Sequence, residues 1–155
     1  YVNDFAFKGM WVNAYRSHIG QVLPGQMPFE GSILENITFG NPQINADTVS
    51  QVIRLVGLKD FVRRQPKGMN SMLFPGGQQI PHTISKRILI ARAIVHQPKI
   101  LILKDALEHF ETSEATRIME YLGHADRPWM LIVAGQSIGW KKICNKTVVL
   151  KNNLK

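Results

Sequence analysis

The sequence predicts an α/β fold built on a parallel sheet, and two features carry that prediction. Residues 84–95 place apolar side chains at helical spacing, and residues 100–103 follow as an unbroken run of isoleucine and leucine. Such a run is typical of a strand covered on both faces. Residues 130–134 form a second run of this kind, and strands that alternate with helices favour parallel pairing.

Two further strands are expected at the ends of the chain. Residues 19–23 are followed by Pro24 and Gly25, which favour a turn, and residues 147–150 form another short apolar run. Residues 1–3 read like the end of a strand, so the sequence resembles a piece cut from a longer one.

Short helices are expected in the middle of the sequence. Residues 32–37 have an amphipathic pattern, and residues 59–64 form another short candidate. Between them, residues 49–56 carry an apolar stripe, with Asn45 suited to the N-cap and Gly57 to the C-terminal stop.

The segment before the central helix is rich in glycine, proline and glutamine. We interpret residues 66–81 as a loop with one short strand at 71–74. Beyond the buried strand, Thr112 or Ser113 caps a helix that ends before Gly123.

Length and composition bound the class of protein. The chain has 155 residues, 45% of them hydrophobic, which suffices for one core. We expect an α/β part, residues 1–30 and 98–155, and a mainly helical subdomain, residues 31–97. No apolar run approaches the roughly 20 residues that cross a bilayer, so this stretch is expected to be soluble. The single cysteine, Cys144, cannot form an internal disulfide.

The chain is strongly basic. Nineteen Lys and Arg against eleven Asp and Glu give a net charge of +8, which favours anionic partners such as nucleotides. The basic residues are scattered rather than interleaved with aromatic residues, and no helix-turn-helix, RNP or zinc signature occurs. We therefore rank nucleic-acid binding last and expect no nucleic-acid partner.

Lys104 and Asp105 are the first candidates for chemistry. They follow the buried strand directly. In open parallel sheets, ligands bind beyond the carboxyl ends of the strands, so this pair is expected at the edge where a site would form.

Three motifs occur in a characteristic order. They are IGQVLPGQMPFEGSILENITFG, ISKRILIARAIVHQPKILILKDALEHFE and MLIVAGQS. Together they resemble the nucleotide-binding domain of ABC transporters, most of all the exporter type, over nearly the whole chain. The family phrase "QR-ARA---P-ILILDE" is matched by Lys86, Arg87, residues 91–93, Pro98 and residues 100–103.

The resemblance implies a P-loop NTPase-like parallel sheet with an inserted helical subdomain. The implied cofactors are ATP and Mg²⁺, and the implied reaction is phosphoryl transfer to water. The implied partners are a second nucleotide-binding domain, which shares two ATP molecules with the first, and the transmembrane domain of a transporter. The parent protein would lie at the cytoplasmic face of the cell membrane.

The phosphate loop of the family does not occur in this sequence. None of the twelve glycines is followed by lysine, so there is no G-x-x-x-x-G-K-[ST] motif. We expect that the first strand and the P-loop lie upstream in a longer parent, or that the parent has lost them. For the chain alone we expect no bound ATP or Mg²⁺ and no metal-ligating residue.

The two positions that the family uses for Mg²⁺ and catalysis are both changed. The magnesium-binding aspartate falls on Lys104, which either contacts phosphate as a point charge or is a solvated residue on a decayed site. The catalytic glutamate falls on Asp105, one methylene shorter, and a base displaced by about 1 Å can lose on the order of a hundredfold in rate.

The neighbouring loops depart as well. The family's loop glutamine falls on Pro24, with Gln26 two residues later as a substitute, and its histidine falls on Gly135, with Gln136 beside it. The aspartate that contacts the partner domain in the family is replaced by Glu111.

The signature motif has two readings. Ungapped alignment puts residues 80–84, IPHTI, at the LSGGQ position, whereas residues 74–78 read FPGGQ but would force Pro81 into the helix. We prefer the ungapped alignment. His82 or Thr83 then caps the helix, whose N-terminal amides favour an anion, although an ordinary cap explains them equally well.

The departures fall on chemical positions, while the packing positions are intact. This pattern predicts an ATP-binding cassette domain with a weakened hydrolytic site, and a chain that is inactive alone. The alternative is a structural or regulatory partner that docks a transporter membrane domain without nucleotide.

Overall fold

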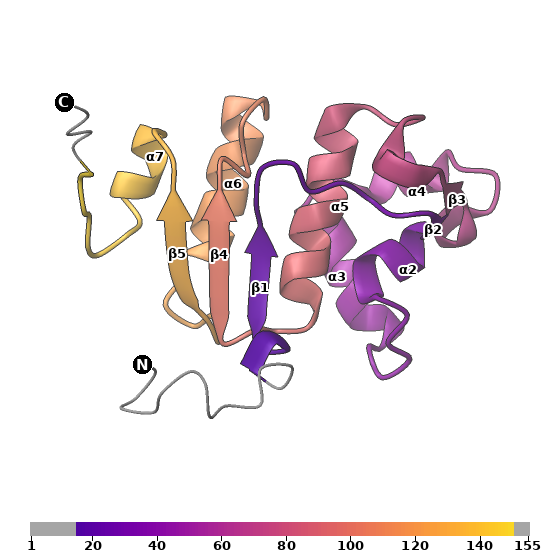
Figure 1. Cartoon of the computed structure of the whole chain (residues 1–155), viewed down its shortest axis with the longest axis horizontal. Coiled ribbons are helices and arrows are strands. Elements are labelled where there is room, and N and C mark those ends of the chain that lie inside the picture. Colours follow the sequence, from indigo (N-terminus) through magenta and orange to yellow (C-terminus); the bar gives the residue numbers. More distant parts are fainter. Residues whose placement is uncertain (1–14, 151–155) are drawn as a thin grey trace.

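A computed structural model of the chain describes residues 15–150 (Figure 1). Its main sheet is parallel and has the order β1-β4-β5. The strands are β1 (Ile19–Val22), β4 (Ile100–Lys104) and β5 (Met130–Ala134). The predicted parallel sheet is thus confirmed, with β4 at its centre. The predicted strand end at residues 1–3 lies outside the described residues.

Helices connect and surround these strands. They are α2 (Ile33–Thr38), α3 (Ala46–Leu55), α4 (Lys59–Arg63), α5 (His82–Val95), α6 (Thr112–Leu122) and α7 (Ile138–Lys141). The 66–81 segment holds two 3₁₀ turns, Gly68–Asn70 and Pro75–Gly77, and β3 (Met72–Leu73), which pairs antiparallel with β2 (Gly31–Ser32).

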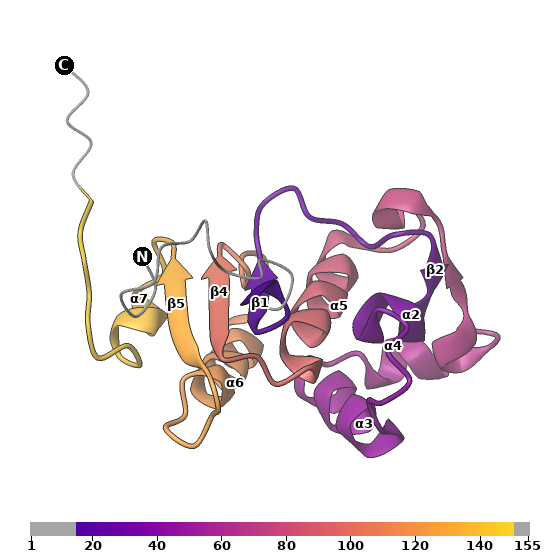
Figure 2. The same cartoon turned by 60° about the horizontal axis from the view of Figure 1, so that its bottom comes forward.

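Helix α5 lies between the sheet and the helices α2 and α3. Figures 1 and 2 show β1 on one side of it and α2 and α3 on the other. Its residues Ile88, Leu89 and Ile90 are buried, as its nearly all-round apolar pattern requires. At Gly20 the backbone of β1 lies so close to the segment after α5 that a Cβ atom on this residue would be 2.9 Å from Pro98 Cγ. The division into an α/β part and a helical subdomain stays a prediction.

The sheet is less covered than predicted. Leu101 and Leu103 of β4 are fully buried, on the face that α6 covers, but Ile100 and Ile102 are only partly buried. In β5, Met130 is 58% exposed. An apolar run satisfies strand propensity on either face, so the sequence alone did not reveal that one face is only partly covered.

Residues 147–150 do not form the predicted strand. They have no regular structure, and Leu150 is 91% exposed. A strand needs a hydrogen-bonded neighbour, which a four-residue apolar run cannot specify.

Helix caps were predicted in part. The Asn45 side chain caps α3 by accepting the N–H of Thr48 at 2.7 Å, as expected. Helix α5 has neither His82 nor Thr83 as its cap, because Pro81 is the N-cap and its carbonyl accepts the first helical N–H groups. Helix α6 is preceded by Glu111 as N-cap, so Thr112 and Ser113 lie inside it.

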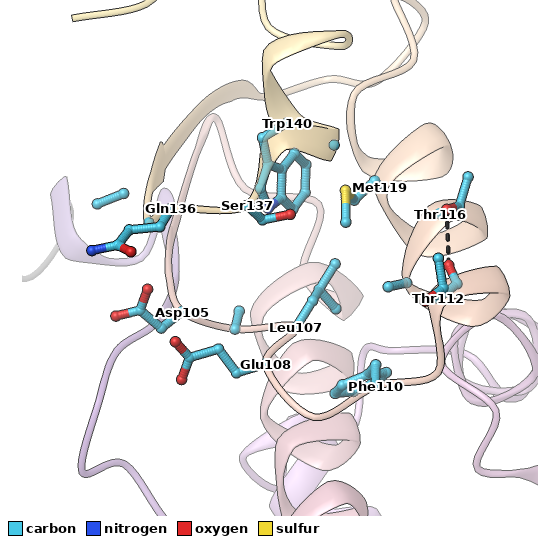
Figure 3. A pocket seen from close by; sticks show the side chains of 15 residues that line it. Asp105, Leu107, Glu108, Phe110, Thr112, Thr116, Met119, Gln136, Ser137 and Trp140 are labelled. Carbon is cyan, nitrogen blue, oxygen red and sulfur yellow. Dashed lines mark hydrogen bonds between the residues drawn. The ribbon is translucent and has the colours of Figure 1, made fainter. Parts of the chain in front are cut away.

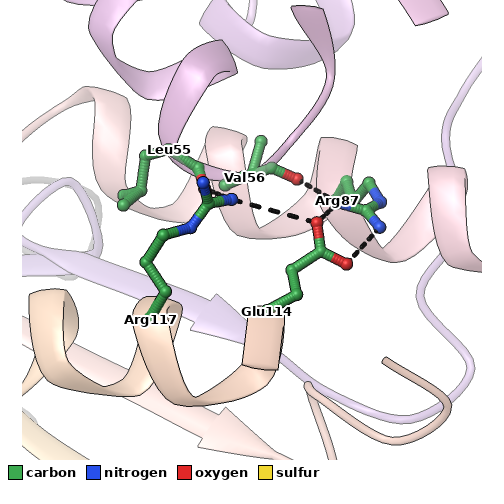
Figure 4. A network of polar contacts seen from close by, with 5 residues as sticks. All are labelled: Leu55, Val56, Arg87, Glu114 and Arg117. Atoms are coloured by element: carbon green, nitrogen blue, oxygen red, sulfur yellow. Dashed lines mark hydrogen bonds and ion pairs between the residues drawn. The ribbon is translucent and has the colours of Figure 1, made fainter. Parts of the chain in front are cut away.

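Arg87 of α5 joins the end of α3 to α6 (Figure 4). Its guanidinium forms a bidentate ion pair with Glu114 of α6 and donates to the Val56 carbonyl at 2.7 Å. The same guanidinium lies over the Phe110 ring, 4.9 Å from its centroid. Arg117 adds a bond to the Leu55 carbonyl at 3.1 Å. The network fixes the turn that follows β4 against α3 and α5.

Among residues 15–150, none of the helices combines the length and hydropathy of a membrane span.

Candidate functional site

A cavity of about 330 Å³ lies beyond the carboxyl ends of β4 and β5 (Figure 3). Its walls come from the turn after β4, the start of α6 and the segment from the end of β5 to α7. The side chains that define it include Asp105, Glu108, Phe110, Met119, Gln136 and Trp140. The cavity is at the sheet edge where the family resemblance predicts chemistry.

Asp105 is held by its backbone at this edge. Its N–H donates to the Ala134 carbonyl at 3.2 Å, which continues the β4–β5 pairing one residue past the strand. Its φ of 50° is left-handed, a conformation that aspartate adopts more readily than most residues. Gly135 leaves room for it, because a Cβ atom at 135 would lie 3.0 Å from Asp105 Oδ1.

Lys104 is directed away from the cavity. It is the last residue of β4, and it shares a sheet face with Ile102 because side chains alternate along a strand. It is exposed and does not line the cavity. The two adjacent candidates therefore serve different faces of the sheet.

Gln26 lies in the turn that leaves β1. Its side-chain Oε1 accepts the backbone N–H of Leu23 at 2.8 Å, and its backbone N–H donates to the Leu23 carbonyl at 3.3 Å. Val22 is paired with Leu103 in the sheet, so this turn is next to the end of β4. The side-chain oxygen of Gln26 is thus engaged in forming the turn.

His82 and Thr83 begin α5, at the same end of the sheet as the strand ends (Figure 1). The His82 ring contacts the His109 ring edge-on, with centroids 6.2 Å apart, so α5 touches the turn that carries Asp105. Of the predicted site residues, the structure brings Asp105 and Gln136 into one cavity; it leaves Lys104, Gln26, His82 and Thr83 outside its lining.

Sequence reasoning missed three residues of this region. No role was predicted for Glu108, His109 or Trp140. Glu108, from the turn after β4, and Trp140, from α7, line the cavity, and His109 contacts His82 of α5. Within the described part of the chain, no group of three or more His, Cys, Asp or Glu side chains has the arrangement of a metal site.

A second hollow, of about 460 Å³, lies on the helical side of the molecule. It is lined by Phe29, Glu30, Gly31, Glu35, Phe39, Gly40 and Met72. Phe29 and Phe39 stack at 5.9 Å between centroids, and Arg92 lies against both rings. Burial of this guanidinium lowers the pKa of Arg92 to about 10. Hydrogen bonds from Ser32 lower the pKa of Glu35 below its usual value, so its carboxylate stays ionised.

Sequence comparison finds many similar proteins. The chain is 28% identical over 137 residues to the alpha-hemolysin translocation ATP-binding protein of Escherichia coli O157:H7, covering 88% of this chain and 19% of that protein. It is 27% identical over 153 residues to the human ATP-binding cassette sub-family B member 5, covering 99% and 12% respectively. No protein-family model matches the chain.

The fold agrees with these relatives. A bacterial Atm1-family ABC exporter with ATP bound superposes with a TM-score of 0.67 at 23% identity, covering 78% of this chain and 21% of that one. The chain is homologous to the ATP-binding cassette domains of ABC exporters. It spans about a tenth to a quarter of the length of such relatives, the larger share being 26% of an uncharacterized ABC transporter ATP-binding protein of Bacillus subtilis.

In the structure, Lys104 is the last residue of β4, the central strand of the sheet.

Proposed function

We propose that the chain is part of an ATP-binding cassette domain of an exporter, with a weakened hydrolytic site. The domain would couple nucleotide binding to transport by a membrane domain. The proposal is carried by one observation: β4, the central strand of a cassette-like parallel sheet, ends in Lys104 and Asp105 at the edge where the chemistry is expected.

The charges at this edge support binding more than hydrolysis. The Lys104 ammonium repels Mg²⁺ but can contact phosphate oxygens as a point charge. Asp105 retains a carboxylate for use as a general base, but its side chain is shorter than glutamate and faces the cavity rather than the face of Lys104. Gln26 uses its Oε1 within its own turn, so a contact from that oxygen to an attacking water requires the turn to open.

The remaining candidates have smaller roles in this proposal. The N-terminal N–H groups of α5, near His82 and Thr83, favour an anion through the helix dipole. Gln136, two residues past the end of β5, offers an amide beside Gly135, the position on which the family's histidine falls.

The test of the weakened site is phosphate release. The chain alone, with MgATP, is expected to release no phosphate above the rate without protein, and Lys104→Ala is expected to behave identically. Mg²⁺-dependent turnover by the natural chain that exceeds that of Lys104→Ala would contradict the proposal.

The partners in this proposal are a second cassette domain and a membrane domain. The second hollow supports the latter contact, because Phe39 and Met72, at 63% and 59% exposed, form an apolar surface rimmed by Glu30 and Glu35. We expect Met72→Ser to weaken co-purification of the natural gene product with its membrane domain several-fold. Ile138→Ser, which removes an even more exposed apolar side chain on α7, is the control and should have no effect.

A second candidate function is a docking partner that binds no nucleotide. It is favoured by the same exposed apolar surface, which includes none of the candidate residues at the strand ends. ATP titration into the natural gene product separates the two functions. Saturable, tight binding excludes the nucleotide-free partner, whereas retained membrane docking without ATP binding supports it.

A further inference from the structure

The cavity beyond β4 and β5 differs in charge from the chain as a whole. The chain has a net charge of +8, yet the charged residues that line this cavity are Asp105 and Glu108, with no Lys, Arg or His among the lining residues. Within residues 15–150, neither carboxylate belongs to an ion pair. Lys104 and His109 are chain neighbours of these residues but do not line the cavity, so the two carboxylates are the charges that a ligand inside it would contact.

The rest of the lining is apolar and aromatic. Met119 and Trp140 are buried at its back, and Leu107 and Phe110 contribute further apolar surface. Figure 3 shows the two carboxylates on one side of the cavity and the side chains of Met119 and Trp140 on the other. The Thr116 hydroxyl is already used, because it donates to the Thr112 carbonyl at 2.8 Å.

This combination selects a class of ligand. A phosphate or other anion would meet two carboxylates and no cation. A neutral apolar molecule would leave those carboxylates without a counter-charge near a partly dry surface. An organic ammonium satisfies both parts, since its charge pairs with carboxylates while its body contacts the apolar wall and an aromatic ring attracts the cation. The volume is at the lower end of the range for small-molecule sites.

We propose that this cavity binds a small organic ammonium ion with an aromatic or aliphatic body, held by Asp105 and Glu108 against Trp140. The site shares Asp105 and Gln136 with the proposed nucleotide site, whereas Lys104, the proposed phosphate contact, serves the other face of the sheet. Two ligands of opposite charge would thus be bound on the two sides of one dipeptide.

The probe for this proposal is 2-phenylethylammonium, compared with 2-phenylethanol and phenylacetate, which have similar bodies but no charge or a negative one. Binding is followed by NMR of the tryptophan indole N–H groups. The Trp140 signal should shift, while that of Trp129, whose indole donates to the Leu122 carbonyl at 2.8 Å, serves as an internal reference. The ammonium should bind at least about tenfold more tightly than either comparator, a difference of about 1.4 kcal/mol.

Two variants test the role of the Glu108 carboxylate. Glu108→Gln should reduce the preference for the ammonium over the alcohol to about twofold or less. Glu111→Gln removes an exposed carboxylate that does not line the cavity, and it should leave the preference unchanged. Equal affinity for the three probes, a shift of Trp129 alone, or an unchanged preference in Glu108→Gln would each overturn the proposal.

Discussion

Two pairs of oppositely charged residues in this chain differ in how their side chains are held. Arg87 and Glu114 are mostly buried, with side chains 14% and 19% exposed, and form a bidentate pair supported by the Val56 carbonyl. Lys104 and Asp105 are neighbours in sequence, but they face different sides of the sheet and form no ion pair with each other. The first pair secures the fold. The second is left available for a ligand.

The contrast shows which part of this cassette homologue is held together by buried side-chain contacts. Helices α3, α5 and α6 meet at Arg87 as a fixed junction, and the same guanidinium packs on Phe110 of the turn after β4. At the end of β4, by comparison, Asp105 is held through its backbone, whose N–H donates to the Ala134 carbonyl.

The largest effect is expected from breaking the junction. Glu114→Ala leaves the mostly buried Arg87 without its counter-charge, so the free energy of unfolding should fall by about 3–5 kcal/mol. Asp60→Ala removes one partner of an exposed pair, Asp60–Arg63, and should cost less than about 1 kcal/mol. Urea denaturation of both variants measures the difference, and similar losses in the two would remove the contrast.

A backbone change beside the junction should come next. Gly57 has a φ of 71°, and a Cβ atom there would lie 2.6 Å from Glu114 Oε1 and also collide with Arg87. Gly57→Ala should cost about 1–2 kcal/mol for the left-handed conformation, and about 1–3 kcal/mol more for displacing the pair. Gly25→Ala is the matched control, because Gly25 has a φ of 78° with open space around it. An equal loss in the free energy of unfolding of the two variants would mean that the Arg87–Glu114 pair is displaced at little cost.

A smaller, pH-dependent effect is expected on the helical side. Burial lowers the pKa of His96 below its usual value, more than its hydrogen bond with the Thr38 backbone raises it. The unfolded chain therefore binds more protons, so stability is greatest above the ordinary histidine pKa of about 6.5 and decreases as the pH falls below it. His96→Phe, which keeps an aromatic ring against Phe39, should weaken this dependence. An unchanged pH profile in that variant would assign the dependence to other groups.

Much of the fold was predictable because its strongest signals are local. The all-round apolar pattern of α5 and the uninterrupted run of β4 each specify an element without reference to distant residues. Asn45 likewise specifies the start of α3 through a contact three residues away.

What the sequence did not predict depends on distant partners. Arg87 and Glu114 are 27 residues apart, and their pairing follows from how α6 is placed against α5. The exposure of Met130 and the absence of a strand at 147–150 likewise depend on what lies beside them. At the site, the position of Lys104 and Asp105 at a strand end was predictable. Their separation onto two faces follows from the alternation of side chains along a strand, whereas the left-handed φ of Asp105 was not predicted.

The central claim is that a cassette architecture is kept here with a weakened hydrolytic site, and measuring ATP binding and hydrolysis together on the natural gene product tests it most directly. The account predicts saturable ATP binding, weakened by Lys104→Ala, with phosphate release that stays at the rate without protein. Rapid Mg²⁺-dependent phosphate release that Asp105→Asn abolishes would contradict it.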